Sequence, residues 1–282
     1  MRCILVATDL SETSYGAIER ARRIAARNGA ALRIVHAARR PPDAESSVAL
    51  EDEVMERVAD RAALSGDTVE NASVRIRSGD AGASILEEAR LCSADLIVLG
   101  THEAPRMSDA LLGTTASHVA QRATVPVLVA QIDPEQRYRR LMAAVDDDTL
   151  EIVLGGALRL FSAEELYVVH AHVPSLQSVL AGGDVALDDL KRDHEHEVNA
   201  VVERIGSTRL EGDPMPRVRS IIEDDEPVDV IIKEWDAIEP DLLVIGTQGR
   251  SGVAKLLQAS IAETVLLGCP SDVLVIPAKA GA

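Results

Sequence analysis

Aromatic side chains are almost absent from this sequence, since phenylalanine, tyrosine and tryptophan together make up 2% of its residues. Hydrophobic residues nevertheless account for 46% of the chain. Any core must therefore be built from valine, isoleucine, leucine and alanine. The 282 residues are enough for two domains of ordinary size, each with a sizeable aliphatic core.

Cysteine is also scarce. Cys3, Cys92 and Cys269 lie far apart in the sequence and form no CxxC motif. This odd number and spacing predict a reducing compartment and argue against a metal knuckle. Because Cys92 and Cys269 fall near the ends of expected helices, we interpret them as small core residues rather than redox groups.

Long apolar runs and basic patches are missing too. No run reaches the roughly 18 residues of a membrane span, and the first ten residues lack the features of a signal peptide. The formal charge of −17 argues against nucleic acid or an anionic membrane as partner. We therefore expect a cytoplasmic protein, in which any bound polyphosphate would need locally arranged donors.

Short aliphatic runs alternate with amphipathic helical segments along the whole chain. We expect strands at 2–8, 31–37, 69–77, 95–100 and 126–130, and again at 141–145, 165–171, 215–222, 241–246 and 273–276. We expect helices at 12–28, 48–64, 83–92 and 114–122, and again at 149–161, 184–206, 228–235 and 260–268. This alternation predicts right-handed crossovers and parallel sheets covered on both faces.

The second half of the chain repeats the first. VATD at 6–9 matches AVD at 144–146, and RIVHA at 33–37 matches YVVHA at 167–171. ADLIVLGT at 94–101 matches PDLLVIGT at 240–247, and VPVLVA at 125–130 matches SDVLVI at 271–276. The matches keep their order and predict a duplicated α/β unit, with domains at 1–131 and 138–282 joined by a linker at 132–137.

A glycine-containing loop follows the strand expected at 241–246. Gly246 and Gly249 are three residues apart, Arg250 and Lys255 follow them, and Ser260 can cap the next helix. Glycines allow backbone N–H groups to approach an oxygen-rich ligand, and a helix start offers unpaired donors. The pattern indicates a phosphate site, although an ordinary strand-to-helix connection explains the glycine spacing equally well.

With the duplication in view, the whole chain resembles the universal stress protein family in its tandem two-domain form. The resemblance implies two Rossmann-like domains of the adenine nucleotide alpha-hydrolase-like type, each a five-stranded parallel sheet with helices on both faces. Nucleotide-binding members are similar in a signature of Gly, two residues, Gly, nine residues, Gly, then Ser or Thr. Members without this signature often do not bind ATP.

The second half keeps most of this signature. Gly246, Gly249 and Ser260 match at the family's spacing, while Ala259 replaces the third glycine. The added methyl group is tolerated at negative φ and costs about 1 kcal/mol or more at positive φ.

The first half departs from the signature in a different place. Gly100, Gly113 and Thr114 match, but Glu103 replaces the second glycine. A carboxylate against phosphates repels them by kcal/mol amounts, unless it turns outward or helps to hold Mg²⁺. The resemblance therefore implies ATP with Mg²⁺, with the second half favoured over the first.

An acidic residue follows the first strand of each half, at Asp9 and Asp146. By resemblance this carboxylate contacts the ribose, and it can also stabilise the following helix N-terminus. The full set of nucleotide-binding residues implied by the resemblance is Ala7, Thr8, Asp9, Ala37, Leu99, Gly100, Gly113, Thr114 and Thr115 in the first half, and Ala144, Val145, Asp146, Ala171, Ile245, Gly246, Gly249, Ala259, Ser260 and Ile261 in the second.

Histidine and carboxylate clusters give weaker signals. His194 and His196 point about 200° apart on a helix, so the segment 193–197 indicates a solvated face rather than a metal site. His36 and His170 end matching strands and are interpreted as structural. No Ser-His-Asp, HExxH or P-loop pattern appears, so we expect no catalytic residue and at most slow ATP hydrolysis.

Two functional hypotheses follow. In the first, ATP orders the loops at 101–113 and 247–259 and changes the surface shown to an unknown protein partner. In the second, the protein is an interaction scaffold that has lost nucleotide affinity. An enzyme such as an ATP-dependent ligase is disfavoured because the SGGxDS pattern is missing. The resemblance also implies an internal pseudo-dimer through 126–130 and 272–276, and a possible homodimer.

Overall fold

The computed structural model describes residues 1–38, 43–64, 71–100, 114–146, 148–172, 184–206, 215–247 and 270–277, with the backbone alone at 12–13, 114 and 184–188. The chain divides into two compact units, Met1–Gln136 and Arg137–Ala280. The loop predicted at 101–113 and the helix predicted at 260–268 lie outside the described residues.

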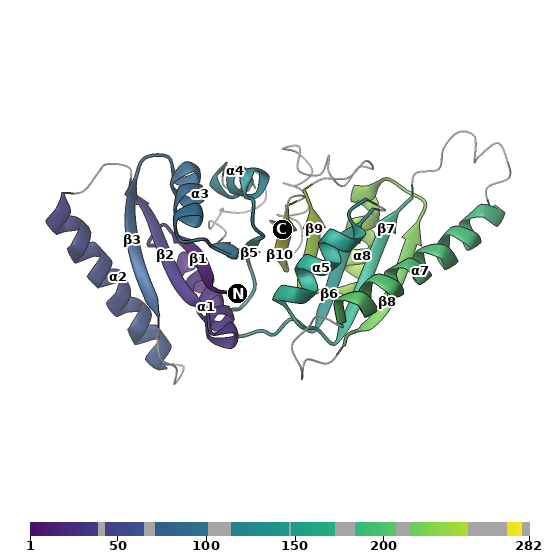
Figure 1. Cartoon of the computed structure of the whole chain (residues 1–282), viewed down its shortest axis with the longest axis horizontal. Helices are drawn as coiled ribbons and strands as arrows, with labels where there is room; N and C mark the ends of the chain where they lie inside the picture. Colours follow the sequence, from purple (N-terminus) through teal and green to yellow (C-terminus); the bar gives the residue numbers. More distant parts are fainter. Residues whose placement is uncertain are drawn as a thin grey trace. The chain divides into compact units, whose positions relative to one another are not determined.

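The first unit is a parallel sheet with the strand order β3-β2-β1-β4-β5 (Figure 1). Its elements are β1 (Cys3–Thr8), α1 (Glu12–Asn28), β2 (Ala31–Ala38), α2 (Ala44–Leu64), β3 (Ala72–Ser78), α3 (Ala81–Leu91), β4 (Leu96–Gly100), α4 (Thr114–Arg122) and β5 (Val127–Ala130).

The second unit repeats this order, as β8-β7-β6-β9-β10, and its strands are also parallel. Its elements are β6 (Arg140–Val145), α5 (Leu150–Leu160), β7 (Glu165–Ala171), α7 (Asp184–Gly206), β8 (Arg217–Glu223), α8 (Pro227–Ile238), β9 (Leu242–Gly246) and β10 (Asp272–Ile276). The predicted fold class, two tandem five-stranded parallel α/β domains, is confirmed.

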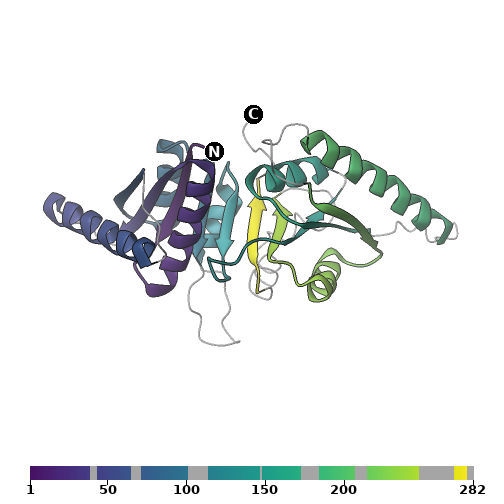
Figure 2. The ribbon, with the colours of Figure 1, turned by 90° about the horizontal axis from the view of Figure 1, so that it is seen from below.

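Right-handed crossovers fix which helix covers which face of the first sheet. The chain moves from β1 to β2 to β3 in one direction, and then returns past β1 to β4 and β5. This reversal puts α1 and α2 on one face and α3 and α4 on the other. The contacts agree, because α1 packs against α2 and α3 packs against α4 (Figure 1). Figure 2 shows α1 on the face of the sheet that is turned toward the viewer.

Local signals place both ends of α1 at the predicted residues. Ser11 caps α1 by accepting the backbone N–H of Ser14 at 3.2 Å. The same helix ends at Gly29, whose φ of 60° is the left-handed conformation that glycine adopts readily. The central strands are buried on both faces, and Ile4, Leu5 and Val6 are all 0% exposed.

Three predicted boundaries are wrong by a few residues. Helix α2 begins at Ala44 rather than 48, because the Asp43 carboxylate accepts the backbone N–H of Ser46 at 2.8 Å and starts the helix earlier. This hydrogen bond, and a second one from the Ser46 hydroxyl at 3.0 Å, also lower the pKa of Asp43. Strand β3 begins at Ala72 rather than 69, directly after Asn71 with φ of 53°. Helix α8 extends to Ile238.

One aspartate in each unit clamps the start of the first strand to the start of the fourth. The Asp95 carboxylate accepts the backbone N–H of Cys3 at 3.1 Å, together with that of the preceding residue. Asp241 accepts those of Arg139 and Arg140 at 2.7 and 2.8 Å. These are the aspartates of the repeated ADL and PDL segments. Their repetition therefore has a structural cause.

The interpretation of residues 193–197 as a solvated face is wrong for one of them. His194 is 5% exposed, and its ring packs edge-on against His170 with the centroids 4.9 Å apart. Its neighbours on either side are exposed. Among the described residues, no group of three or more histidines, cysteines or carboxylates could hold a metal ion, and none of the described helices is long and apolar enough to cross a membrane.

Candidate nucleotide site at the carboxyl edges

The strand order creates a point of divergence at the carboxyl edge of each sheet. In the first unit, β1 and β4 are neighbours, but the chain leaves β1 toward β2 and leaves β4 toward β5 on the opposite side. Neighbouring parallel strands whose connections diverge leave a crevice outside their carboxyl ends, where doubly wound folds bind ligands. The register that pairs Val6 with Val98 brings Thr8 and Gly100 to this edge.

The second unit has the same divergence between β6 and β9. Here Ala144 is the register partner of Ile245, so Val145 and Gly246 end the two strands side by side. Helix α5 packs on β6 and β9 from one face, while α8 packs on β6 and β7. The predicted residues at these strand ends are thus brought together in each unit.

The acidic residue of the first unit lies exposed at the edge. The Asp9 carboxylate accepts the backbone N–H of Ser11 at 3.0 Å, and the intervening Leu10 has φ of 68°. This tight turn carries the chain from β1 into α1. It leaves the carboxylate in contact with solvent, where it could accept hydrogen bonds from a ligand hydroxyl.

Thr8, just before this aspartate, is held by a polar network. Its hydroxyl lies 2.7 Å from that of Ser14, and its carbonyl accepts a hydrogen bond from His36 Nδ1 at 2.9 Å. The network ties the ends of β1 and β2 to the first turn of α1. His36 therefore has the structural role expected of it, and Ser14 is a site-forming residue that the sequence analysis missed.

The acidic residue of the second unit is buried instead. Asp146 is 4% exposed and Thr149 is 8% exposed. Asp146 Oδ1 accepts the backbone N–H of Thr149 at 2.9 Å and its hydroxyl at 2.7 Å, while the Asp146 N–H donates to Thr149 Oγ1 at 3.0 Å. These reciprocal bonds start α5, so the helix-start role considered for Asp146 is present.

The matching aspartates therefore have different environments. In both units the partner gives its backbone N–H and its hydroxyl to the carboxylate, but the partner is two residues on in the first unit and three residues on in the second. The D-x-x-T spacing at 146–149 would have predicted the hydrogen bonds between Asp146 and Thr149. The ribose contact implied for Asp9 and Asp146 stays a prediction.

The remaining predicted residues divide into buried, half-buried and undescribed groups. Side chains of Leu99, Ala144, Val145, Ala171 and Ile245 are buried, so these residues can face a ligand only through their backbone. Ala7, Ala37 and Thr115 are half-buried, and the side chain of Thr114, which begins α4, is not described. Gly113, Gly249, Ala259, Ser260 and Ile261 lie outside the described residues.

The fold and the two edges define a class: a duplicated, doubly wound α/β protein with a polar carboxyl edge in each unit. The profile of the universal stress protein family matches residues 1–131 and 137–277. The chain therefore belongs to the universal stress protein family, and it carries two such domains in tandem.

The fold is also found in a solved structure of similar length. The chain is similar to a universal stress protein from Archaeoglobus fulgidus, with 19% identity, a TM-score of 0.66, and coverage of 98% of this chain and 96% of that one. It is also similar to a universal stress protein solved in complex with cAMP, with 29% identity, a TM-score of 0.37, and coverage of 46% of this chain and 95% of that one.

A curated relative matches a shorter stretch. The stress response protein NhaX of Bacillus subtilis is 27% identical over 81 residues, which is 29% of this chain. The match spans 49% of that relative, about half of its length.

Proposed function

We propose that this protein binds an adenine nucleotide, ATP with Mg²⁺, at the carboxyl edge of the second unit. The observation that carries the proposal is the pairing of strand ends there. Gly246 ends β9 beside the end of β6, where Asp146 starts α5. A residue without a side chain next to a helix start suits the close approach of an oxygen-rich ligand.

Each residue at this edge has a proposed role. The backbone of Ala144 and Val145 lines the adenine, because their side chains are buried in the sheet. Asp146 faces the ribose, with its carboxylate oriented by Thr149. The backbone at Gly246 receives the phosphates, and Mg²⁺ enters with them as the counterion of the polyphosphate.

The choice of the second unit rests on the sequence signature. The second glycine of that signature is Gly249 in the second half and Glu103 in the first. A carboxylate at that place repels phosphate, and the overall charge of −17 gives no compensating attraction.

A second candidate function is an interaction scaffold without nucleotide. The observation that favours it is the burial of Asp146, which is 4% exposed and already accepts two hydrogen bonds from Thr149. A carboxylate used in this way has less capacity for ribose hydroxyls. Ala259, which replaces the third glycine of the signature, also favours the scaffold function.

Isothermal titration with ATP and Mg²⁺ separates the two functions. The decisive variant is Gly249→Glu, which gives the second half the residue that the first half has at Glu103. The matched control is Gly100→Val, which alters the corresponding strand end of the first unit. Circular dichroism checks that both variants fold. AMP and cAMP as further ligands test whether the phosphate chain contributes to affinity.

We expect the wild type to bind one ATP, Gly249→Glu to lose binding, and Gly100→Val to keep it. The proposal fails if the wild type shows no heat of binding at about millimolar ATP. A dissociation constant of about 1 mM corresponds to a binding free energy of only about 4 kcal/mol, so this concentration tests even weak binding. The proposal also fails if Gly100→Val abolishes binding while Gly249→Glu does not, because the site would then be in the first unit.

A bound nucleotide would act on partners rather than on a substrate. We propose that ATP changes the surface offered to a protein partner by ordering the loops that follow β4 and β9, with hydrolysis slow or absent. Homodimerisation belongs to the same proposal. Sedimentation of the protein with and without ATP measures whether the nucleotide changes assembly.

A further inference from the structure

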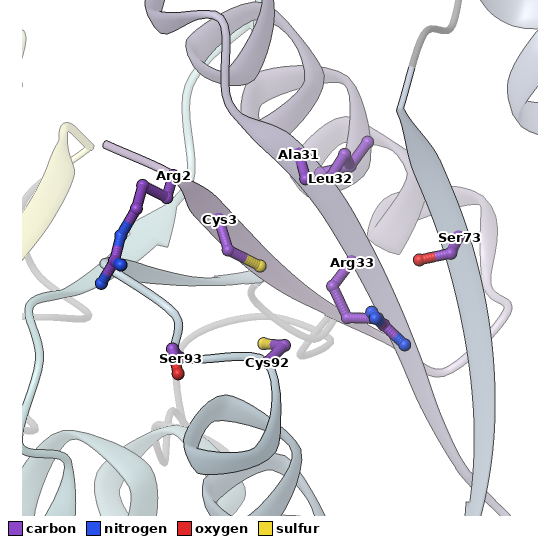
Figure 3. A pocket seen from close by; sticks show the side chains of 8 residues that line it. All are labelled: Arg2, Cys3, Ala31, Leu32, Arg33, Ser73, Cys92 and Ser93. Atoms are coloured by element: carbon purple, nitrogen blue, oxygen red, sulfur yellow. The ribbon is translucent and has the colours of Figure 1, made fainter.

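Two of the three cysteines come together at the amino edge of the first sheet. Cys3 begins β1, and Cys92 caps the carboxyl end of α3, so the fold makes neighbours of two residues that are 89 positions apart in the sequence. Their thiols share a hydrogen bond. Figure 3 shows both sulfur atoms pointing into the space between the two side chains. Cys92, which the sequence led us to interpret as a small core residue, is thus half-buried beside a second thiol.

A pocket of about 290 Å³ opens onto the two thiols. Arg2, Arg33, Ser73 and Ser93 line it together with the cysteines. Cys3 is 8% exposed and Cys92 is half-buried, so a small reagent reaches Cys92 more readily. The pocket is at the amino edge of the first sheet, opposite the carboxyl edge that holds Thr8 and Asp9, because β1 runs from Cys3 to Thr8.

The backbone around the thiols is fixed. The Asp95 carboxylate accepts the N–H of Cys3 at 3.1 Å, and the Asp95 N–H donates to the Cys3 carbonyl at 2.8 Å. The turn from Cys92 to Asp95 is thereby fastened to the first residue of β1. Cys92 Sγ also lies 3.7 Å from the carbonyl of Ala89. The two sulfurs are thus held close without a covalent link.

Charges around the pair favour a thiolate on one of the two sulfurs. The buried Glu88 carboxylate pairs with Arg33 at 3.4 Å and with Arg77 Nε at 2.8 Å, so two cations surround one anion. The hydrogen bond from Cys3 is the largest effect and lowers the pKa of Cys92, and Arg33 lowers it further. Burial and the Glu88 carboxylate oppose this, but the net effect is a lowered pKa. The pKa of Cys3 is raised by the same hydrogen bond and by its burial.

The second unit has other residues at the positions that correspond to Cys3 and Cys92. Asp241 bonds to the carbonyl of Arg140 as Asp95 bonds to that of Cys3, which makes Arg140 the counterpart of Cys3. Ile238, three residues before Asp241, is likewise the counterpart of Cys92. There the Arg140 guanidinium donates to the Ile238 carbonyl at 2.5 Å. The fold therefore closes without thiols, and the pair is specific to the first unit.

We propose that Cys3 and Cys92 are a redox-active dithiol that forms a reversible intramolecular disulfide when it meets a hydroperoxide. The Cys92 thiolate attacks one peroxide oxygen, the O–O bond breaks, and the peroxide leaves as an alcohol or water. The Cys92 sulfenic acid is then attacked by the Cys3 sulfur, so an S–S bond forms and the S–O bond breaks. The oxygen leaves as water with the proton of Cys3. Both thiols are oxidised, and one peroxide is reduced.

This modification site does not depend on nucleotide binding. Cysteines that lie far apart in a sequence are usually interpreted as unpaired. Here the fold, rather than the sequence spacing, brings the second sulfur next to the first. The more accessible sulfur, that of Cys92, attacks and the buried sulfur of Cys3 resolves, an arrangement typical of reversible thiol oxidation. A cellular dithiol would restore the reduced form by exchange at the same sulfurs.

The test uses the full-length chain with Cys269→Ser as the background, so that only the proposed pair remains. The reduced protein is treated with hydrogen peroxide, its free thiols are counted, and its peptides are mapped without reductant. Cys3→Ser and Cys92→Ser are then compared in this background, after circular dichroism has shown that they fold. Arg33→Gln is the electrostatic variant, and its counterpart in the second unit, Tyr167→Phe, is the control.

In the background protein we expect both thiols to disappear, a peptide linking Cys3 to Cys92 to appear, and dithiothreitol to reverse the change. Cys3→Ser should accumulate a Cys92 sulfenic acid that dimedone traps, whereas Cys92→Ser should keep its remaining thiol. Arg33→Gln should slow alkylation of Cys92 at neutral pH by roughly threefold or more, because it removes a neighbouring positive charge. Tyr167→Phe should not change that rate.

Three results would overturn the proposal. The first is that the background protein keeps both thiols at a peroxide dose that oxidises Cys92 in Cys3→Ser. The second is that oxidation yields only disulfides between chains. The third is that Cys3 in Cys92→Ser reacts with peroxide as fast as the pair does, which would show that the neighbouring sulfur contributes nothing.

Discussion

Helix α5 contains two adjacent glycines, Gly155 and Gly156. Replacing each in turn by alanine separates the energy of packing against the sheet from the gain in helix propensity. A Cβ at Gly156 would lie 2.7 Å from Ile276 Cδ1 and 3.1 Å from its Cγ2, whereas a Cβ at Gly155 would meet nothing within 4 Å. Ile276 is 0% exposed in β10, so its side chain has little room to move. Both substitutions to alanine stay in the same helix, and only one of them presses on the sheet.

The expected stabilities differ accordingly. Gly155→Ala should stabilise the second unit by about 1 kcal/mol, the helix propensity difference between the two residues. Gly156→Ala gains the same term but adds a methyl group to a packed core, which costs about 1–3 kcal/mol. We therefore expect Gly156→Ala to be less stable than Gly155→Ala by about 1–3 kcal/mol.

The single tryptophan makes this measurement selective for the second unit. Trp235 is the one tryptophan of the sequence, and its indole N–H donates to Ser271 Oγ at 3.1 Å. Urea unfolding followed by its fluorescence therefore reports on that unit. Equal midpoints for the two variants would refute the close approach of α5 to β10.

The same pair of variants bears on the proposed nucleotide site. Ile276 is the register partner of Gly246, and its carbonyl accepts the N–H of Thr247 at 2.9 Å. A displaced Ile276 would move the strand end that we propose receives the phosphates. Gly156→Ala should therefore weaken ATP binding relative to Gly155→Ala, as titration with ATP would measure.

Three further predictions concern the strand starts. Ser93 and Glu239 have φ of 51° and 47° in corresponding turns, so glycine at either position should stabilise its unit by about 0.5–1 kcal/mol in thermal unfolding. Asp241→Ala leaves two backbone N–H groups without their carboxylate, and should destabilise the second unit by about 2–3 kcal/mol in Trp fluorescence, an effect that unchanged midpoints would exclude. Cys3→Ala removes the hydrogen bond that most lowers the pKa of Cys92, so the pH profile of Cys92 alkylation should move to higher pH, and a shift to lower pH would contradict the assignment.

The order of the elements was predictable because each one is specified locally. Aliphatic runs of four to six residues mark the strands, and Ser11 and Gly29 mark the ends of α1 within its own sequence. The early start of α2 at Ala44 was also a local signal, from Asp43 and Ser46, and a cap search applied to that loop would have found it.

The environments of site residues were less predictable because they depend on packing. Asp9 and Asp146 occupy matching sequence positions, yet Asp9 is exposed whereas Asp146 is buried, with 4% of its surface exposed. His194 lies in a charged segment, and only the position of α7 against β7 explains its burial on His170. Spacing along one helix cannot reveal such a neighbour.

Long-range proximity was the least accessible feature. Cys3 and Cys92 meet because β1 and β4 are adjacent in the order β3-β2-β1-β4-β5, which places the end of α3 over the start of β1. No local pattern contains that information, and the repeat could not supply it because the second half has Arg140 and Ile238 at these positions.

The aspartate clamps also constrain the order in which the chain can fold during synthesis. In the first unit the clamp joins residues 92 positions apart, and in the second it joins residues 101 apart. Contacts of such separation form late, because the intervening chain must be closed first. A nascent chain that ends before Asp95 holds β1 without its clamp and Cys3 without its partner sulfur. Once residues through Gln136 have left the ribosome, the first unit has every residue of its own sheet, and it can close before the second unit exists.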